Sequence, residues 1–172
     1  MTNIFLTGYR ATGKTSVANL LATALSKEMV DADVYLEQEA GMTIAEVFAV
    51  EGEQGFRERE TAVVRTLAAR ENMVIALGGG AVLREENREA LIGRGITVWL
   101  TASPDSIYER MTTDPLTGQR RPNLTSTGGL QEIHDLLAQR TPLYRQVADY
   151  TVDTEGLSPE QVASAVVRQL RD

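Results

Sequence analysis

The chain has 172 residues, no cysteine and a formal net charge of −7, and this length suits one globular domain with a substantial core. The absence of cysteine excludes disulfides, thiolate catalysis and cysteine-ligated zinc, and the acidic balance argues against general nucleic-acid binding. The sequence contains no run of about 18 apolar residues, so no membrane span is predicted. A strand that begins at the N-terminus leaves no room for a signal peptide, so we expect a cytoplasmic protein.

A glycine-rich loop is the first motif along the chain. Residues 8–15 read GYRATGKT, which fits G-x-x-x-x-G-K-[ST] at every fixed position. The apolar run at 4–6 predicts a buried strand before the loop, and apolar residues at 17, 20, 21, 24 and 25 predict a helix after it. This context predicts a phosphate-binding loop in which backbone N–H groups and the helix N-terminus hold an anion. The expected ATP-binding residues here are Ala11, Thr12, Gly13, Lys14, Thr15 and Ser16.

Two acidic residues follow the second predicted strand, at about 28–31. Asp31 and Asp33 would lie at the carboxyl end of a parallel strand, where open α/β sheets place their ligands. We expect Asp31 and the Thr15 hydroxyl to hold Mg²⁺, and Asp33 to face the hydroxyl of a phosphate acceptor. The alternative is that an aspartate here only caps the helix that follows.

A helical insert, at about 34–70, interrupts the strand–helix alternation and is the expected acceptor-binding segment. Gly41 ends its first helix, a capping box at 43–46 starts the next, and a further helix is predicted from Phe56 to Arg70. Arg57 would lie near the N-terminus of that helix, which is unfavourable for a cation unless a ligand is bound. The alternative is an ion pair with Glu60, three residues along the helix.

Three glycines, 78–80, follow the continuous apolar strand at 74–77 and would let a ligand approach the backbone at Gly79. A fourth strand is predicted at 96–100, a fifth at 150–152, and capped helices start at Ser103 and Ser158. The element order predicts an α/β protein: a single three-layer α/β/α domain, residues 1–172, with a five-stranded parallel sheet.

Periodicity stops between about 112 and 129, in a segment with two prolines, three glycines and few apolar residues. A structureless segment of this length in a compact domain is often functional. It contains Arg120 and Arg121, so we interpret it as a lid that brings an arginine to phosphate; an ordinary surface loop is the alternative. A helix is predicted from Leu130 to Val147, kinked or interrupted at Pro142.

Together these motifs resemble the shikimate kinases, a group of small P-loop kinases similar to nucleoside monophosphate kinases. The resemblance rests on GYRATGKT at 8–15, DAD at 31–33, EGEQGFRERE at 51–60, GGGA at 78–81, RRP at 120–122 and RTPLY at 140–144. It implies ATP-dependent phosphorylation of shikimate at its 3-hydroxyl, with Mg²⁺ as the cofactor, shikimate and ATP as small-molecule partners, and a monomeric enzyme.

The resemblance also implies roles for individual residues. Lys14 would hold the ATP phosphates and act in catalysis, and Asp33 would bind the shikimate hydroxyls and orient or deprotonate the attacking one. Arg57 and Arg140 would bind the shikimate carboxylate, and the backbone at Gly79 would close the site. Arg121 would move onto the ATP phosphates, with Arg120 as a rival for this role, and Arg110 would lie beside the adenine together with the segment near Pro159.

The chain departs from the family pattern at Ala32, where the family commonly has threonine, and in the lid apart from Arg121-Pro122. Two alternatives stay open from the sequence. One is a related kinase that acts on gluconate or a nucleotide, although the set of arginines favours a small carboxylate. The other is a nucleotide-binding regulator without turnover, against which the complete set of Lys14, Thr15, Asp31 and Asp33 argues.

Overall fold

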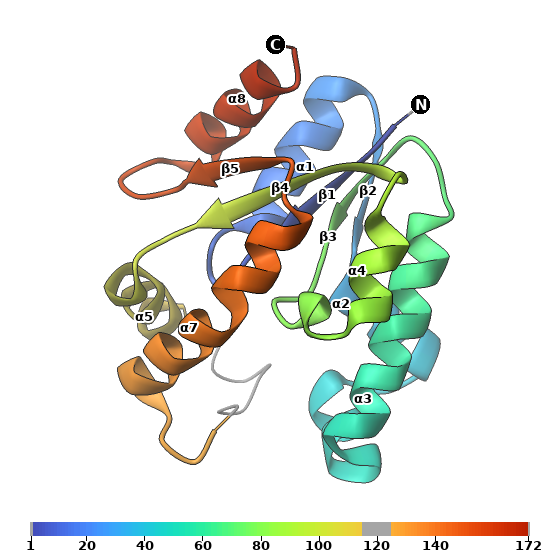
Figure 1. Cartoon of the computed structure of the whole chain (residues 1–172), viewed down its shortest axis with the longest axis vertical. Coiled ribbons are helices and arrows are strands. Elements are labelled where there is room, and N and C mark those ends of the chain that lie inside the picture. Colours follow the sequence, from blue (N-terminus) through green and yellow to red (C-terminus); the bar gives the residue numbers. More distant parts are fainter. Residues whose placement is uncertain (1, 115–124, 172) are drawn as a thin grey trace.

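The computed structural model describes residues 2–114 and 125–171. Its centre is a sheet of parallel strands in the order β2-β3-β1-β4-β5 (Figure 1). The predicted five-stranded parallel sheet is therefore confirmed. The strands are β1 Asn3–Thr7, β2 Glu28–Asp31, β3 Met73–Ala76, β4 Gly95–Thr101 and β5 Tyr150–Asp153.

Helices cover both faces of the sheet, as the alternation of strands and helices predicts. The helices are α1 Lys14–Leu25, α2 Ala32–Ala40, α3 Ile44–Ala68, α4 Glu85–Leu91, α5 Pro104–Thr113, α7 Gly129–Val147 and α8 Pro159–Gln169, with a short 3-10 turn η1 at Ala81–Leu83. α1 and α8 pack on one face through a cluster that includes Leu6, Leu21 and Val166. α2, α3 and α4 pack on the other through Phe5, Leu67 and Leu91 (Figure 1).

The helical insert between β2 and β3 differs from the predicted boundaries. Thr43 forms the expected capping box: its hydroxyl accepts from the N–H of Glu46, whose carboxylate accepts from the N–H of Thr43. The next two predicted helices are joined as α3, which bends at Gly52, where φ is 70° and ψ is −175°. Because the backbone of Gly52 is not helical, helical geometry resumes after it, and Arg57 lies about one turn beyond this start, near the N-terminus as predicted.

The predicted interruption at Pro142 is wrong, because α7 is one helix from Gly129 to Val147 with Pro142 inside it. Proline removes the hydrogen bond that the carbonyl of Ala138 would otherwise accept. Both residues are exposed, so water can bind that carbonyl. Trp99 is a packing residue as expected, since its ring stacks on Tyr144 with 5.7 Å between centroids.

Within the described part of the chain, no helix combines the length and the hydrophobicity that a membrane span requires. Arg120, Arg121 and most of the predicted lid lie outside the described residues.

Candidate active site

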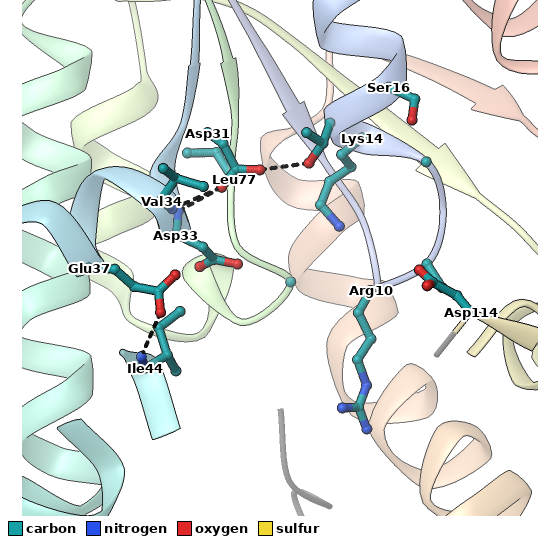
Figure 2. Close-up of a pocket in the computed structure, with 14 residues that line it drawn as sticks. Arg10, Lys14, Ser16, Asp31, Asp33, Val34, Glu37, Ile44, Leu77 and Asp114 are labelled. Atoms are coloured by element: carbon teal, nitrogen blue, oxygen red, sulfur yellow. Dashed lines mark hydrogen bonds between the residues drawn. The ribbon is translucent and has the colours of Figure 1, made fainter. Parts of the chain in front are cut away.

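The carboxyl ends of β1, β2 and β3 meet at one edge of the sheet and form a cleft of about 310 Å³. Each strand contributes the residues that follow it: the glycine-rich loop after β1, the acidic pair at the end of β2, and the glycine turn after β3. Figure 2 shows Lys14 directed into the space between Asp33 and Arg10. The lining residues are Arg10, Ala11, Gly13, Lys14, Thr15, Ser16, Asp31, Asp33, Val34, Glu37, Ile44, Leu77, Gly79 and Asp114.

The loop at 8–15 is folded around its own backbone. Lys14 Nζ donates to the carbonyls of Gly8 and Tyr9, each at 2.8 Å, and the buried Thr12 hydroxyl donates to the Tyr9 carbonyl, also at 2.8 Å. Ala11 has a φ of 62°, in the left-handed region, which costs an L-residue about 1 kcal/mol. The loop is therefore held in a strained shape at the N-terminus of α1, the position expected for phosphate binding.

Asp31 has two functions in the structure. Its Oδ1 accepts from the N–H groups of Asp33 and Val34 at 2.9 and 3.2 Å, so Asp31 caps α2. Its Oδ2 accepts from the Thr15 hydroxyl at 2.6 Å (Figure 2). The capping alternative from the sequence is thus correct for Asp31, and it leaves the second carboxylate oxygen facing the glycine-rich loop.

Asp33 lies in the first turn of α2 and faces the glycine turn that follows β3. A Cβ atom at Gly78 would lie 2.9 Å from Asp33 Oδ1 and 3.0 Å from Glu60 Oε1. A Cβ at Gly80 would overlap the guanidinium of Arg57. A side chain at either position would require Asp33, Glu60 or Arg57 to move, so the glycines allow these three side chains to gather closely around the turn.

Arg57 forms the ion pair that the sequence offered as an alternative: Nη1 lies 2.7 Å from Glu60 Oε2, and both side chains are buried. Burial raises the pKa of Glu60, while the positive charges of Arg57, Arg140 and Arg84 act in the opposite direction. One buried carboxylate is therefore surrounded by several guanidinium groups. Arg57 also lies 3.7 Å from Glu53, and Arg84 pairs with Glu86, so these two arginines have carboxylate partners of their own.

Arg140 is 4% exposed and projects from α7 over the ring of Tyr9, with 5.5 Å from Cζ to the ring centroid. Among the described residues it forms no ion pair, and its Nε has no hydrogen-bond partner. A buried guanidinium without a carboxylate partner is costly unless it binds an anion. Arg140 is therefore well suited to bind a ligand carboxylate.

The structure brings most predicted site residues into the cleft, namely Ala11, Gly13, Lys14, Thr15, Ser16, Asp31, Asp33 and Gly79. Thr12, Arg57, Arg110 and Arg140 do not line it. Arg57 and Arg140 lie beside it, around Gly78–Gly80 and Tyr9. Arg110 Nη1 donates to the carbonyl of Ala11 and to the Thr154 hydroxyl, both at 3.2 Å, which places it against the back of the loop.

Sequence reasoning missed the contacts that hold this site from α7. Arg10 Nη2 lies 2.9 Å from Glu132 Oε2, and Tyr144 donates from its hydroxyl to the Gly79 carbonyl at 2.5 Å. The available signal was a mismatch in the α7 pattern: Glu132 occupies the same helix face as the apolar residues Ile133, Leu136 and Leu137. A carboxylate on an apolar face indicates a buried partner.

Tyr144→Phe is expected to lower the free energy of unfolding by about 1–2 kcal/mol, because the substitution keeps the stacking on Trp99 but leaves the buried Gly79 carbonyl without its donor. Urea denaturation followed by circular dichroism measures this change. Tyr108→Phe, at an exposed position, is the control. Equal midpoints for the two variants would show that the Tyr144–Gly79 bond contributes nothing.

Comparison with known families bears directly on this site. The family model described as "Shikimate kinase" matches residues 10–171, which is nearly the whole chain. The chain belongs to the shikimate kinase family. The resemblance inferred from the motifs is therefore confirmed.

Individual shikimate kinases agree with this assignment over the full length of the chain. The enzyme of Symbiobacterium thermophilum is 44% identical over 170 residues, covering 99% of this chain and 97% of that protein. The enzyme of Rhodopirellula baltica is 43% identical over 166 residues, covering 96% and 89%. The structure of the Acinetobacter baumannii shikimate kinase in complex with shikimate superposes with a TM-score of 0.93 at 38% identity, covering 99% of this chain and 93% of that one.

Proposed function

We propose that this protein transfers the γ-phosphate of ATP to the 3-hydroxyl of shikimate, giving shikimate 3-phosphate and ADP, a step of aromatic amino acid biosynthesis. One observation carries the proposal: a phosphate-binding loop, an opposed aspartate and the buried Arg57 meet at one glycine turn, and the buried Arg140 lies over Tyr9 of the same loop. The loop suits the donor, which is a polyphosphate. The aspartate suits the hydroxyl of the acceptor, and the arginines suit its carboxylate.

On the donor side, the N–H groups of the loop and the N-terminus of α1 would hold the ATP phosphates. Lys14 would add a point charge for the outer phosphates. Its ammonium group already lies inside the loop, bound to two loop carbonyls, so a short movement of a flexible side chain brings it to the nucleotide. Arg110, fixed between Ala11 and Thr154, would border the nucleotide base on the outer side of the loop.

The residues at the foot of α1 fit a magnesium ion. The Thr15 hydroxyl and Asp31 Oδ2 are hard oxygen donors 2.6 Å apart at the edge of the cleft. Mg²⁺ in kinases is commonly bound by one or two such side chains together with substrate phosphates. When bound, Mg²⁺ would neutralise charge on the transferring phosphoryl group.

On the acceptor side, Asp33 would accept a hydrogen bond from the attacking hydroxyl and remove its proton as the new P–O bond forms. The carboxylate of shikimate would bind Arg57 and Arg140, with the Gly79 backbone closing the pocket. Two guanidinium groups give a planar carboxylate strong, oriented hydrogen bonds. The acceptor would thus be fixed at both ends, with its hydroxyl in line with the donor.

The proposal also covers the lid, the oligomeric state, the location in the cell and the domain organisation. An arginine of the lid, Arg121 or Arg120, would stabilise negative charge on the phosphates during transfer. We propose a monomeric, cytoplasmic protein consisting of one kinase domain, with residues at about 34–70 serving the acceptor and residues at about 112–129 serving as the lid.

The test is ADP release from MgATP, measured with shikimate, with gluconate, with nucleoside monophosphates and without acceptor. We expect turnover with shikimate alone. Turnover with gluconate or a nucleotide would retain the phosphate site but reject the acceptor pocket. Tight ATP binding without turnover on any acceptor would instead favour a regulatory protein.

A further inference from the structure

Ala11 is the strained residue of the glycine-rich loop, and the contacts of two arginines, Arg110 and Arg10, limit its movement. Ala11 adopts the left-handed conformation, with a φ of 62°, although it carries a Cβ atom. Such a conformation persists only where surrounding contacts fix it. Arg110 from α5 holds the carbonyl of Ala11 at 3.2 Å on one side. Arg10, the residue before Ala11, is bound by a separate ion pair with Glu132.

The side chain of Arg10 carries its charge away from the expected phosphate position and towards α7. Figure 2 shows its side chain extending away from both Lys14 and Asp33. Its Nη2 lies 2.9 Å from Glu132 Oε2 of α7, and the two residues are only 8% and 1% exposed. The other oxygen of Glu132 accepts from the N–H of Thr125, so this carboxylate is fully engaged.

The backbone of Arg10 packs closely on the glycine turn, since a Cβ atom at Gly79 would lie 3.2 Å from the Arg10 nitrogen. The guanidinium of Arg10 is bound by Glu132, and the carbonyl of Ala11 is bound by Arg110. Contacts on both residues therefore limit how far the peptide between Arg10 and Ala11 can relax.

We propose that the buried Arg10–Glu132 ion pair acts as a positioning clamp that keeps Ala11 in its strained conformation, so that the loop amides stay aligned for the phosphates of the nucleotide. The proposal rests on the proposed function, because it gives the clamp a role in ATP binding. Arg10 and Glu132 act through the loop backbone and are positioning residues. Buried ion pairs seldom stabilise a fold more than apolar residues of similar size. A directional anchor for a strained loop is a role that apolar residues would not supply.

Glu132→Gln is the first test. The amide oxygen can still accept from Thr125, but the ion pair with Arg10 is lost. We expect the Kd for MgADP, measured by calorimetry, to rise about tenfold as Ala11 relaxes. The KM for shikimate should stay within about twofold, because the contacts of Arg57 and Arg140 are unchanged. Glu86→Gln is the matched control, since the Arg65–Glu86 pair has the same 2.9 Å separation but is exposed.

The decisive variant adds Ala11→Gly to Glu132→Gln. Glycine adopts the left-handed conformation without strain, so the double variant should recover MgADP affinity to within about threefold of the wild type. Arg10→Met with Glu132→Leu removes both charges together and guards against misfolding of the single variant. It should show the same loss of MgADP affinity, and Ala11→Gly should again restore it.

Unchanged MgADP affinity in a folded variant without the pair would overturn the clamp, as would a loss that Ala11→Gly does not restore. An equal rise in the KM for shikimate would also overturn it, because it would indicate general disturbance of the site. The MgADP measurement needs no acceptor. Failure of the clamp is therefore separate from failure of the proposed function, which would appear as wild-type protein that binds MgADP without phosphorylating shikimate.

Discussion

Asp33→Asn is expected to lower kcat for shikimate phosphorylation by about 10²–10⁴-fold, the range typical of a lost general base. The asparagine side chain has nearly the same shape and can still hydrogen-bond the acceptor, but it cannot take the proton of the attacking hydroxyl. The Kd for MgADP should change far less than kcat, because the proposal assigns Asp33 to the acceptor and Asp33 lies against the glycine turn after β3. Steady-state assays and calorimetry measure the two quantities.

Glu39→Gln is the control for Asp33→Asn, since it removes a carboxylate from an exposed position of the same helix. It should leave kcat unchanged. If Asp33→Asn retained wild-type turnover, another group would have to accept the proton, and the regulatory alternative would gain support in a protein with tight nucleotide binding.

Arg140→Ala is expected to raise the Kd for shikimate by about 10–150-fold, corresponding to the loss of one charged hydrogen bond of about 1.5–3 kcal/mol. Arg140 is buried, contacts the ring of Tyr9 and has no carboxylate partner within the described residues. Its removal therefore takes away a ligand contact without leaving a protein carboxylate unpaired. MgADP affinity should change far less than shikimate affinity.

Arg145→Ala provides the comparison for Arg140→Ala, because Arg145 is exposed on the same helix. Thermal unfolding of both variants shows whether α7 remains intact. An equal loss of shikimate and MgADP affinity in Arg140→Ala would contradict the assignment of this arginine to the acceptor carboxylate.

The sequence was most informative where function depends on local pattern. The loop at 8–15, the strand before it and the helix after it follow from residues that are neighbours in the chain. Asp31 and Asp33 could be placed at a ligand-binding edge because every parallel strand in such a sheet ends there. Residues at these positions line the cleft in the structure.

The contacts that hold the site in shape could not be predicted in this way. Arg10 and Glu132 are separated by 122 residues, and Tyr144 and Gly79 by 65. Their pairing depends on how α7 crosses the edge of the sheet, which no local pattern specifies. Gly52 interrupts the helical backbone, in line with its local preference, whereas the helix continues through Pro142, where the carbonyl that proline leaves without a donor is exposed to solvent.

The pairing of β2 with β3 has a consequence for protein engineering. Because these strands are parallel neighbours, with Glu28 opposite Met73 and Asp31 opposite Ala76, the segment between them leaves the sheet at its carboxyl edge and re-enters it at the opposite edge. Any replacement for this segment must therefore cross the face of the sheet in the same way. A segment from another small-molecule kinase could be grafted between the same two strands without moving β1 or α1, so new acceptor preferences could be selected on an unchanged nucleotide-binding half.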